Sequence, residues 1–380
     1  MNFELTEEMK MLKEMAYKFA VSEIKPVSQE CDEHEKYLPE IRIKAAENGL
    51  VGSWIPEQYG GPGAGILGNT IITEEISKID MGIGLNIVAS GFGCESILKY
   101  GTEEQKNTYL PPICQGVKVC AGAYTEPNAG TDVSGYKTRA VKDGKDYVIN
   151  GNKMFITNGT VCDFMVAQCI TNPEEKKHNS FSLIIVPADA KGITRNKIHG
   201  KMGISASDTA EIAFEDVRVP QNNLVGKEGQ GFRQLMHFFD ITRVMVSGQA
   251  LGISEACLET SIKYVKERTA FGAPLGSYQM TQMKLTEMAI RIEALRGLVY
   301  KAAWLIDQGK PDYTLAAMAK FYGGQTAVFC ANYAVELHGG YGYIEEYPVQ
   351  KWYRDAKILE LYEGTKEAEI MTIGRALQAR

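Results

Sequence analysis

A single carboxylate near the C-terminus, Glu363, stands in a setting that suits proton abstraction. It precedes Gly364 in the segment Tyr362–Thr365, which interrupts a stretch with helical periodicity. Glycine is unfavourable inside a helix and commonly marks an end, a turn or a close approach of backbone to a ligand. A carboxylate held at such an irregularity is a candidate general base. A solvated glutamate beside a loop is the alternative that this motif alone leaves open.

The composition of the chain is that of an ordinary globular protein. Its 380 residues are 44% hydrophobic and 23% charged, with a net charge of −6. This balance gives no reason to expect nucleic acid or an anionic membrane as a partner. No apolar run approaches the roughly 20 residues that cross a bilayer, and the acidic N-terminus lacks the pattern of a signal peptide. We therefore expect a cytoplasmic protein without a membrane partner.

The 8 cysteines are scattered along the chain. No Cys-x-x-Cys pair occurs, and no histidine accompanies a cysteine at the spacing of metal ligands. We expect reduced thiols rather than a disulfide framework, and no metal site.

Hydrophobic periodicity divides the chain into three parts, residues 1–118, 119–224 and 225–380. The first and third have the apolar spacing of helices, whereas the second has short runs rich in Val, Ile, Phe, Tyr and Thr, separated by turn residues. This order predicts an α+β protein in which a β domain is inserted between two helical domains.

The expected elements follow from the same patterns and from turn residues. Thr6 should cap the first helix and Pro26 should end it, and Asp143-Gly144 predicts a hairpin turn. Further helices are expected near 37–49, 68–79, 83–99, 102–116, 230–268, 279–308, 312–337 and 366–379.

The segment Gly63–Gly68 matches the G-x-G-x-x-G pattern of dinucleotide-binding proteins. That motif requires a preceding buried strand within a βαβ unit. Here the glycines follow a polar Gly/Pro loop and open a predicted helix. We expect no nicotinamide-type site at this position.

A series of segments in fixed order resembles the acyl-CoA dehydrogenases over essentially the whole chain. The segments are Thr125–Asp132, Asn150–Gly159, Met202–Thr209, Phe239–Arg243, Arg268–Gly272, Gly339–Tyr343, Tyr353–Lys357 and Tyr362–Thr365. The resemblance implies an N-terminal helical domain, a middle β-barrel-like domain and a C-terminal four-helix bundle, assembled as a homotetramer. It also implies FAD as cofactor, an acyl-CoA thioester as substrate and an electron-transferring flavoprotein as electron acceptor.

The resemblance implies that Glu363 removes the C2 proton while hydride leaves C3 for flavin N5, an anti-elimination that gives a 2-enoyl-CoA. Some family members carry the base at the position of Thr242, which cannot serve here. A desolvated carboxylate has a raised pKa, which suits a weak carbon acid. Gly364 would allow close approach, so that the Glu363 amide can donate to the thioester oxygen.

Cofactor contacts implied by the resemblance fall into two groups. Tyr124, Thr125, Phe155 and Thr157 would meet the flavin ring. A second group would contact the adenosine end of the cofactor and the pyrophosphate of a flavin in a neighbouring subunit. It consists of Arg268, Phe271, Gln279, Glu336, Gly339, Gly340, Thr365 and Glu367. Tyr124 and Glu336 depart from the family, which usually has a small or aliphatic residue and often Gln at these positions.

The implied substrate contacts are Thr131 near the thioester, Arg243 near the nucleotide of CoA, and Asp240 and Gly364. For Arg243, an intersubunit ion pair is the alternative. The sequence leaves the identity of the acyl group open. Small residues at 82, 84, 89, 91 and 93 indicate either close helix packing or a wide pocket for a branched, cyclic, aryl-substituted or dicarboxylic acyl group.

Three functions stay open at this point. The first is an acyl-CoA dehydrogenase. The second is an enoyl-CoA reductase on the same fold, for which the residues would be identical. The third is a catalytically silent homologue that binds acyl-CoA or flavin.

Overall fold

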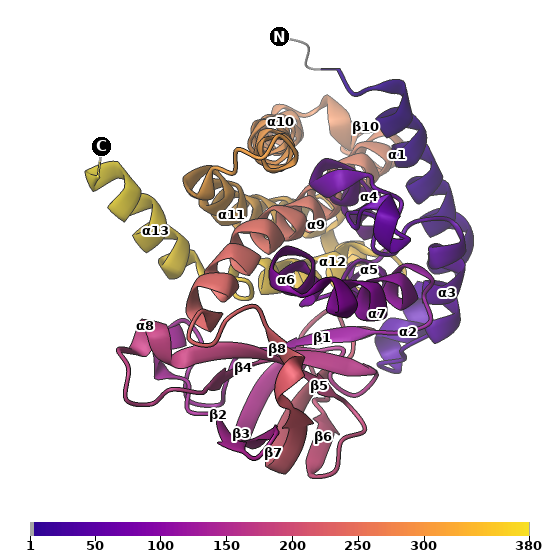
Figure 1. The fold of residues 1–380 in the computed structure, drawn as a ribbon. Coiled ribbons are helices and arrows are strands. Elements are labelled where there is room, and N and C mark those ends of the chain that lie inside the picture. The colour runs from indigo at the N-terminus through magenta and orange to yellow at the C-terminus, as the bar shows by residue number, and fades with distance from the viewer. Residues whose placement is uncertain (1–3, 380) are drawn as a thin grey trace.

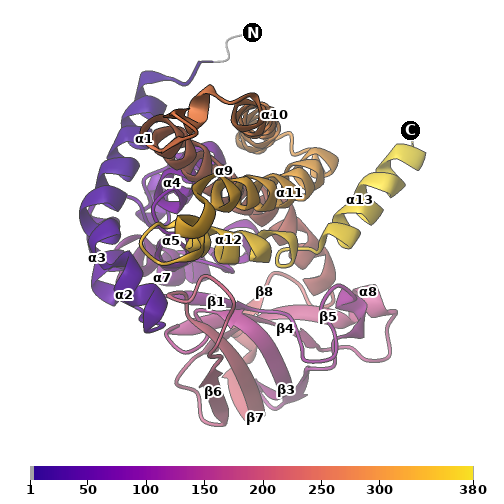
Figure 2. The same ribbon diagram turned by 180° about the vertical axis from the view of Figure 1, so that it is seen from behind.

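The computed structural model describes residues 4–379 and contains helices at both ends of the chain around a β domain (Figure 1). The helices form one body, and the strands lie beneath it in both views (Figures 1 and 2). The predicted helix–sheet–helix order is therefore confirmed. No helix among the described residues is both long and apolar enough to cross a membrane.

The first helical segment begins as predicted but ends differently. Thr6 Oγ1 accepts a hydrogen bond from the Met9 amide at 3.3 Å at the start of α1 (Glu7–Phe19). The expected end at Pro26 is wrong, because a π-helical turn (Ala20–Ile24) and a 3₁₀ turn (Lys25–Val27) lead directly into α2 (Ser28–Glu33). Proline is tolerated in the first positions of a helical turn, where its missing N–H is not needed.

The rest of the N-terminal part contains α3 (Pro39–Glu47), α4 (Gly65–Ser77), α5 (Met81–Val88), α6 (Cys94–Tyr100) and α7 (Glu103–Cys114). The single helix expected over 83–99 is wrong, because α5 and α6 are separate. Gly93 lies between them with a φ of 110°, in the region that glycine adopts readily.

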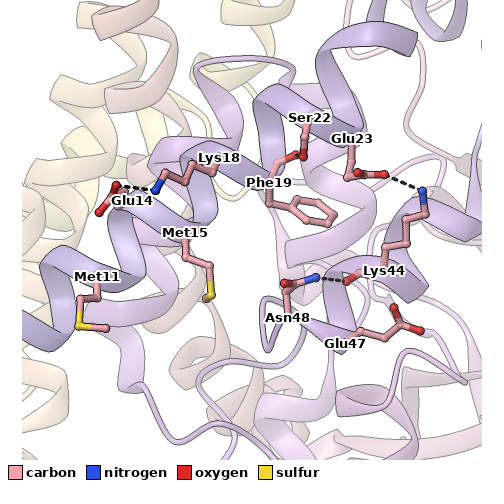
Figure 3. Close-up of a pocket in the computed structure, with 10 residues that line it drawn as sticks. All are labelled: Met11, Glu14, Met15, Lys18, Phe19, Ser22, Glu23, Lys44, Glu47 and Asn48. Carbon is pink, nitrogen blue, oxygen red and sulfur yellow. Dashed lines mark hydrogen bonds and ion pairs between the residues drawn. The ribbon is translucent and has the colours of Figure 1, made fainter.

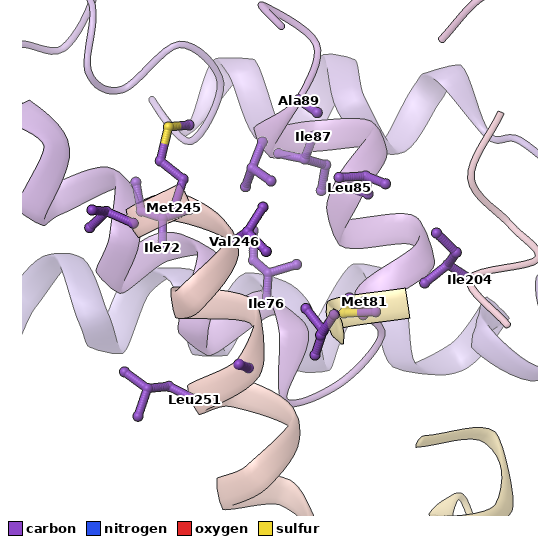
Figure 4. Packing of buried hydrophobic residues seen from close by; sticks show 14 of the residues in the cluster. Ile72, Ile76, Met81, Leu85, Ile87, Ala89, Ile204, Met245, Val246 and Leu251 are labelled. Carbon is purple, nitrogen blue, oxygen red and sulfur yellow. The ribbon is translucent and has the colours of Figure 1, made fainter. Parts of the chain in front are cut away.

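The glycines of this region pack closely against neighbouring segments. A Cβ atom built on Gly82, Gly84, Gly91 or Gly93 would lie 2.8–3.3 Å from the nearest isoleucine or valine atom. Figure 4 shows the dense core here, where Ile72 and Ile76 of α4 lie near Val246 of α9 (Gly231–Glu267). The small residues are therefore explained by packing, and a wide acyl pocket loses its support from the sequence.

The β domain contains eight strands in one sheet. They are β1 (Cys120–Ala123), β2 (Arg139–Asp143), β3 (Asp146–Thr157), β4 (Phe164–Ile170), β5 (Phe181–Pro187), β6 (Ile193–Lys197), β7 (Thr209–Pro220) and β8 (Leu224–Val225), with the short α8 (Lys177–Ser180) before β5. The order is β6-β7-β3-β2-β4-β5-β8, and β1 pairs in parallel with β4. The predicted hairpin at Gly144 is confirmed, since Asp143 pairs with Asp146.

Three long helices, α9, α10 (Gln279–Asp307) and α11 (Tyr313–His338), form the centre of the C-terminal part. The short strands β9 (Thr269–Ala270) and β10 (Ala273–Pro274) connect α9 to α10, and α12 (Val349–Ala356) and α13 (Lys366–Gln378) follow α11. Helix α4 packs against both α9 and α10, so one core joins the two helical parts. Helix α13 extends away from this body (Figures 1 and 2).

The Gly63–Gly68 segment forms the start of α4, where the first amides bond to a carboxylate of the same chain. No strand immediately precedes it, and the carboxylate of Asp307 accepts hydrogen bonds from the Ile66 and Leu67 amides at 2.7 and 2.9 Å. These donors are the groups that a phosphate would need. All eight cysteines are free and buried.

Candidate functional site

Glu363 lies in a tight turn between a 3₁₀ segment (Lys357–Glu360) and α13. Its φ is 54°, and that of Gly364 is 102°. A left-handed conformation costs a non-glycine residue on the order of 1 kcal/mol or more, and such residues gather at functional sites. The left-handed turn therefore sets the direction in which the Glu363 side chain leaves the backbone.

Thr242 of α9 holds this carboxylate, since its Oγ1 donates to Glu363 Oε2 at 2.5 Å. Part of the Glu363 residue remains accessible, yet desolvation raises the pKa of its carboxyl to about 7, against the lowering effects of the Thr242 hydrogen bond and of Arg243 and Lys320. A carboxyl group of this pKa is available as a base near neutral pH and is more basic than an exposed glutamate.

A buried charged cluster supports the turn from behind. Lys320 of α11 donates a hydrogen bond to the Gly364 carbonyl oxygen. Glu369 of α13 lies against Gly364, where a Cβ atom would come within 2.1 Å of its Oε1. Arg243 forms ion pairs with Glu369 at 3.0 Å and with Asp240 at 3.3 Å. The turn is thus fixed by α9, α11 and α13 together. A larger residue at position 364 would be strained at this φ and would displace the Glu369 carboxylate.

The electrostatics of this cluster follow from its burial. Burial lowers the pKa of Lys320 to about 8, while nearby Glu369 and Glu363 oppose that effect. Burial raises the pKa of Asp240 to about 6, with Arg243 acting against it. The positive charges of Lys320 and Arg243 therefore favour ionised Glu363, and desolvation opposes it.

The predicted substrate residues are brought together only in part. Asp240, Arg243 and Gly364 all lie in the cluster around Glu363. Arg243 makes both of its ion pairs within its own chain. Thr131 is exposed in the loop after β1, and no hydrogen bond among the described residues joins it to Glu363.

The predicted flavin-ring residues form a second surface, in the β domain. The β3–β7 pairing shifts register between Lys153 and Ile156, and Phe155 at this bulge has a φ of 60° and is 63% exposed. The Met154 amide donates to the Thr125 carbonyl at 2.8 Å, which places Thr125 beside the residue that precedes Phe155 in β3. Thr157 ends β3 and is partly buried. An exposed, outward-held aromatic side chain beside hydrogen-bonding groups fits a planar heterocycle.

A buried ion pair holds this surface in place. Lys153 is fully buried and its Nζ donates to the Tyr124 carbonyl at 2.9 Å and to Glu126 at 3.0 Å. Glu126 in turn accepts from the Lys137 and Thr138 amides at 2.6 and 2.9 Å. The segment after β1 is therefore tied firmly to β3.

The residues predicted for the pyrophosphate and adenosine lie elsewhere, around the β9–β10 hairpin. Arg268 and Gln279 are exposed, and Phe271 is 100% exposed with a φ of 50°. A Cβ atom on Gly339 or Gly340 would meet nothing within 4 Å, so the backbone there is open to a ligand. An exposed guanidinium group offers the paired donors that suit a pyrophosphate.

Three other predicted cofactor residues have local partners. Thr365 caps α13, since its Oγ1 accepts from the Ala368 amide at 3.3 Å. Glu367 is exposed in the first turn of that helix, where a negative charge is favourable. Glu336 forms an ion pair with Lys284. For all three, the cofactor role stays a prediction.

Sequence reasoning missed Lys320, Glu369 and the supporting role of Thr242. One signal was available: Lys320 is the single charged residue between Tyr313 and Val335, in a helix of small and apolar residues. A lone charge in such a stretch is buried at a cost unless it has a partner.

Two other features do not take part in this site. A groove of 880 Å³ between α1 and α3 is lined by Met11, Met15 and Phe19, among others, and by none of the predicted site residues (Figure 3). Glu74, Glu75 and Glu255 lie close enough to share a metal ion. Their charges are balanced by Lys13, Lys78 and Arg296.

Comparison with known proteins covers the whole chain. Family models match in three parts: the acyl-CoA dehydrogenase N-terminal domain over residues 6–117, the middle domain over 121–217 and the C-terminal domain over 229–378. An acryloyl-CoA reductase (NADH) from Anaerotignum propionicum is 43% identical over 382 residues, which cover 100% of this chain and 97% of the relative.

Two solved structures are similar over 100% of both chains. The butyryl-CoA dehydrogenase of Megasphaera elsdenii is 39% identical, with a TM-score of 0.96. A chain from a structure described as "Electron transferring flavoprotein of Acidaminococcus fermentans: Towards a mechanism of flavin-based electron bifurcation" is 41% identical, with a TM-score of 0.98.

Proposed function

Because the chain belongs to the acyl-CoA dehydrogenase family, whose members are FAD-dependent oxidoreductases, we propose that it interconverts an acyl-CoA and its 2-enoyl-CoA, with Glu363 as the base. One observation carries this proposal: a carboxyl group with a pKa of about 7 at a left-handed turn, hydrogen-bonded to Thr242. FAD, when bound, supplies the acceptor for the C3 hydride.

The turn gives Glu363 two tasks. Its carboxylate takes the C2 proton, and Thr242 holds Oε2 so that the other oxygen is free to face the substrate. The Glu363 amide donates to the thioester oxygen, and no backbone carbonyl among the described residues competes for that N–H. One preorganised donor of this kind contributes about 3 kcal/mol to the stabilisation of a developing oxyanion.

The proposed cofactor contacts are those implied by the sequence. The flavin ring is contacted by Tyr124, Thr125, Phe155 and Thr157. The exposure of Phe155 supports this role, as does the bond of Lys153 that anchors its strand to Tyr124. Arg268, Phe271 and Gln279 reach a flavin in a neighbouring subunit of a homotetramer. Their exposure on the β9–β10 hairpin and α10 supports this assignment. Thr131 and Arg243 contact CoA.

The electron partner is proposed to be an electron-transferring flavoprotein, supported by the similarity to a chain in a structure of that protein. The reverse reaction, reduction of a 2-enoyl-CoA, is the second candidate function. The 43% identity to an acryloyl-CoA reductase favours it. In both directions the proton is exchanged between C2 of the acyl group and the Glu363 carboxylate.

The test of the proposed function is an anaerobic visible spectrum of the FAD-loaded protein with acyl-CoA thioesters added singly. Bleaching of the flavin band by butanoyl-CoA is the expected result. Glu363→Gln should slow bleaching at least about 10³-fold while flavin and thioester binding persist, because the amide cannot accept the proton. The matched control is Glu104→Gln, which alters an exposed glutamate in the first turn of α7.

Equal bleaching rates in the wild type and Glu363→Gln would overturn the assignment of the base. The direction of the reaction is tested with dithionite-reduced enzyme and the corresponding 2-enoyl-CoA. Reoxidation by the enoyl thioester that is faster than reduction by the saturated one favours the reductase.

A further inference from the structure

Lys201 is a partly buried cation that has no task in the proposed reaction so far. It lies in the loop between β6 and β7, and its Nζ donates hydrogen bonds to the Ser207 carbonyl and to Thr209 Oγ1, the latter at 3.1 Å. No acidic side chain in the described part of the chain forms an ion pair with it. Its hydrogen-bond partners are neutral, so its positive charge is not balanced by direct contact.

The carboxylate with the largest effect on Lys201 is bound to another residue. Asp208 is 1% exposed, and its two oxygens accept hydrogen bonds from the amide and the hydroxyl of Thr160 at 2.8 and 2.5 Å. Burial lowers the pKa of Lys201 to about 8, and the charge of Asp208 opposes that effect. The ammonium group is therefore mostly protonated at neutral pH.

Strand pairing places this ammonium group on the side of the sheet that carries Thr157. Thr209 at the start of β7 lies directly opposite Thr157 at the end of β3, and the neighbouring pair is Ile156 with Ala210. Ile156 and Ala210 belong to the hydrophobic core of the β domain. Because successive side chains of a strand point to opposite faces, Thr157 and Thr209 both face away from that core. The Lys201 ammonium group, bonded to Thr209, lies on the same side.

The charge of Lys201 is therefore close to the surface proposed for the flavin ring. Cβ atoms of directly opposed residues are about 5 Å apart, so the ammonium group lies within roughly 10 Å of the Thr157 side chain. Phe155, two residues earlier in β3, is the exposed aromatic residue of that surface. Charges interact appreciably over such a distance where burial lowers the effective dielectric constant.

The proposed reaction changes the charge at this surface. The C–H bonds at C2 and C3 break and a C2–C3 double bond forms. The C2 proton passes to Glu363, and the C3 hydride passes with its electron pair to FAD, which thereby gains one negative charge. A nearby cation stabilises the reduced cofactor more than the oxidised one, since only the reduced form carries the added charge.

We propose that Lys201 raises the reduction potential of the bound FAD by placing a positive charge beside the surface formed by Phe155 and Thr157. This inference rests on the proposed function, which assigns the flavin ring to that surface. The competing role for Lys201 is to hold the loop between β6 and β7 through its hydrogen bonds alone. Substitutions that separate the charge from the hydrogen bonds distinguish the two roles.

The test is the two-electron reduction potential of the FAD-loaded protein, measured at pH 7 by reductive titration against a reference dye, without thioester. Lys201→Met and Lys201→Gln should lower the equilibrium constant for reduction about tenfold, which is about 30 mV for a two-electron couple. Glutamine can still donate hydrogen bonds in the loop, whereas Lys201→Arg keeps the charge and should retain the wild-type potential. Lys191→Met, at an exposed lysine before β6, is the control that should leave the potential unchanged.

Denaturant unfolding of the same variants completes the test. Lower stability of the Met and Gln variants with a wild-type potential would overturn the electrostatic role of Lys201, as would an equal fall in potential in the Met, Gln and Arg variants. A potential that depends on the charge at position 201, in a protein whose flavin no acyl-CoA thioester bleaches, would overturn the proposed function alone.

Discussion

At the scale of single residues, the pKa of Glu363, the proposed base, reflects two opposed effects. Desolvation raises its pKa to about 7, and the charges of Arg243 and Lys320 limit that rise. Because the carboxyl must be ionised to accept a proton, bleaching should increase with pH through about 7. The same raised pKa makes folding less favourable as pH rises above the unfolded value near 4.5, since ionisation is easier in the unfolded chain.

Lys320 gives a direct test of this balance. Lys320→Met removes a positive charge near Glu363, so the pKa of the base should rise and the pH midpoint of bleaching should move upward by about one unit. The measurement is the pH profile of the anaerobic half-reaction. Lys366→Met, at an exposed lysine in α13, is the control. A lower rate with an unchanged midpoint would mean that Lys320 only supports the turn through its bond to Gly364.

At the scale of elements, the proposed flavin-ring residues lie on two segments of the β domain, the segment after β1 and strand β3. One lysine joins these two segments. Lys153 of β3 holds both the Tyr124 carbonyl and Glu126. Burial lowers the pKa of Lys153, and the charge of Glu126 opposes this, so the pair is mutually dependent. Removing one partner of a buried ion pair is far more costly than replacing both.

Lys153→Met should therefore lower the free energy of unfolding by about 3 kcal/mol. It should also weaken FAD retention, because Thr125 and Phe155 lose their fixed relation. The measurements are denaturant unfolding and the ratio of flavin to protein absorbance after gel filtration. Lys142→Met, at an exposed lysine paired with Glu228, should change neither quantity. Full FAD retention in the Lys153 variant would contradict the anchoring role.

Sequence patterns predicted the helices and strands better than they predicted the contacts between them. The periodicities of helix and strand are local, so the order of elements and the hairpin at Gly144 followed from them. The break before Gly93 was missed because glycine does not by itself mark a helix end within a run of apolar residues. Glu363 was proposed from the glycine beside it and from the family resemblance. The contact of Lys320 with Gly364 was not predicted, since it spans 44 residues and depends on how α11 and α13 pack.

At the scale of the whole molecule, the two helical parts share one core, although the β domain separates them in sequence. Helix α4 is buried between α9 and α10, and Asp307 at the end of α10 bonds to the first amides of α4. Asp307→Ala should therefore lower the free energy of unfolding by about 1 kcal/mol, as expected for the loss of an N-terminal cap. Denaturant unfolding measures this. Glu293→Ala, at an exposed position of α10, is the control, and equal stabilities would contradict the link.

The position of α4 has a consequence for synthesis of the chain on the ribosome. Its residues from Thr70 to Ser77 are all buried in the finished fold, but α9 and α10, which cover them, emerge only after the entire β domain. Until then this apolar helix has an uncovered face. The N-terminal helices therefore cannot reach their final packing until α9 and α10 have been synthesised, and the uncovered face of α4 is open to aggregation until then.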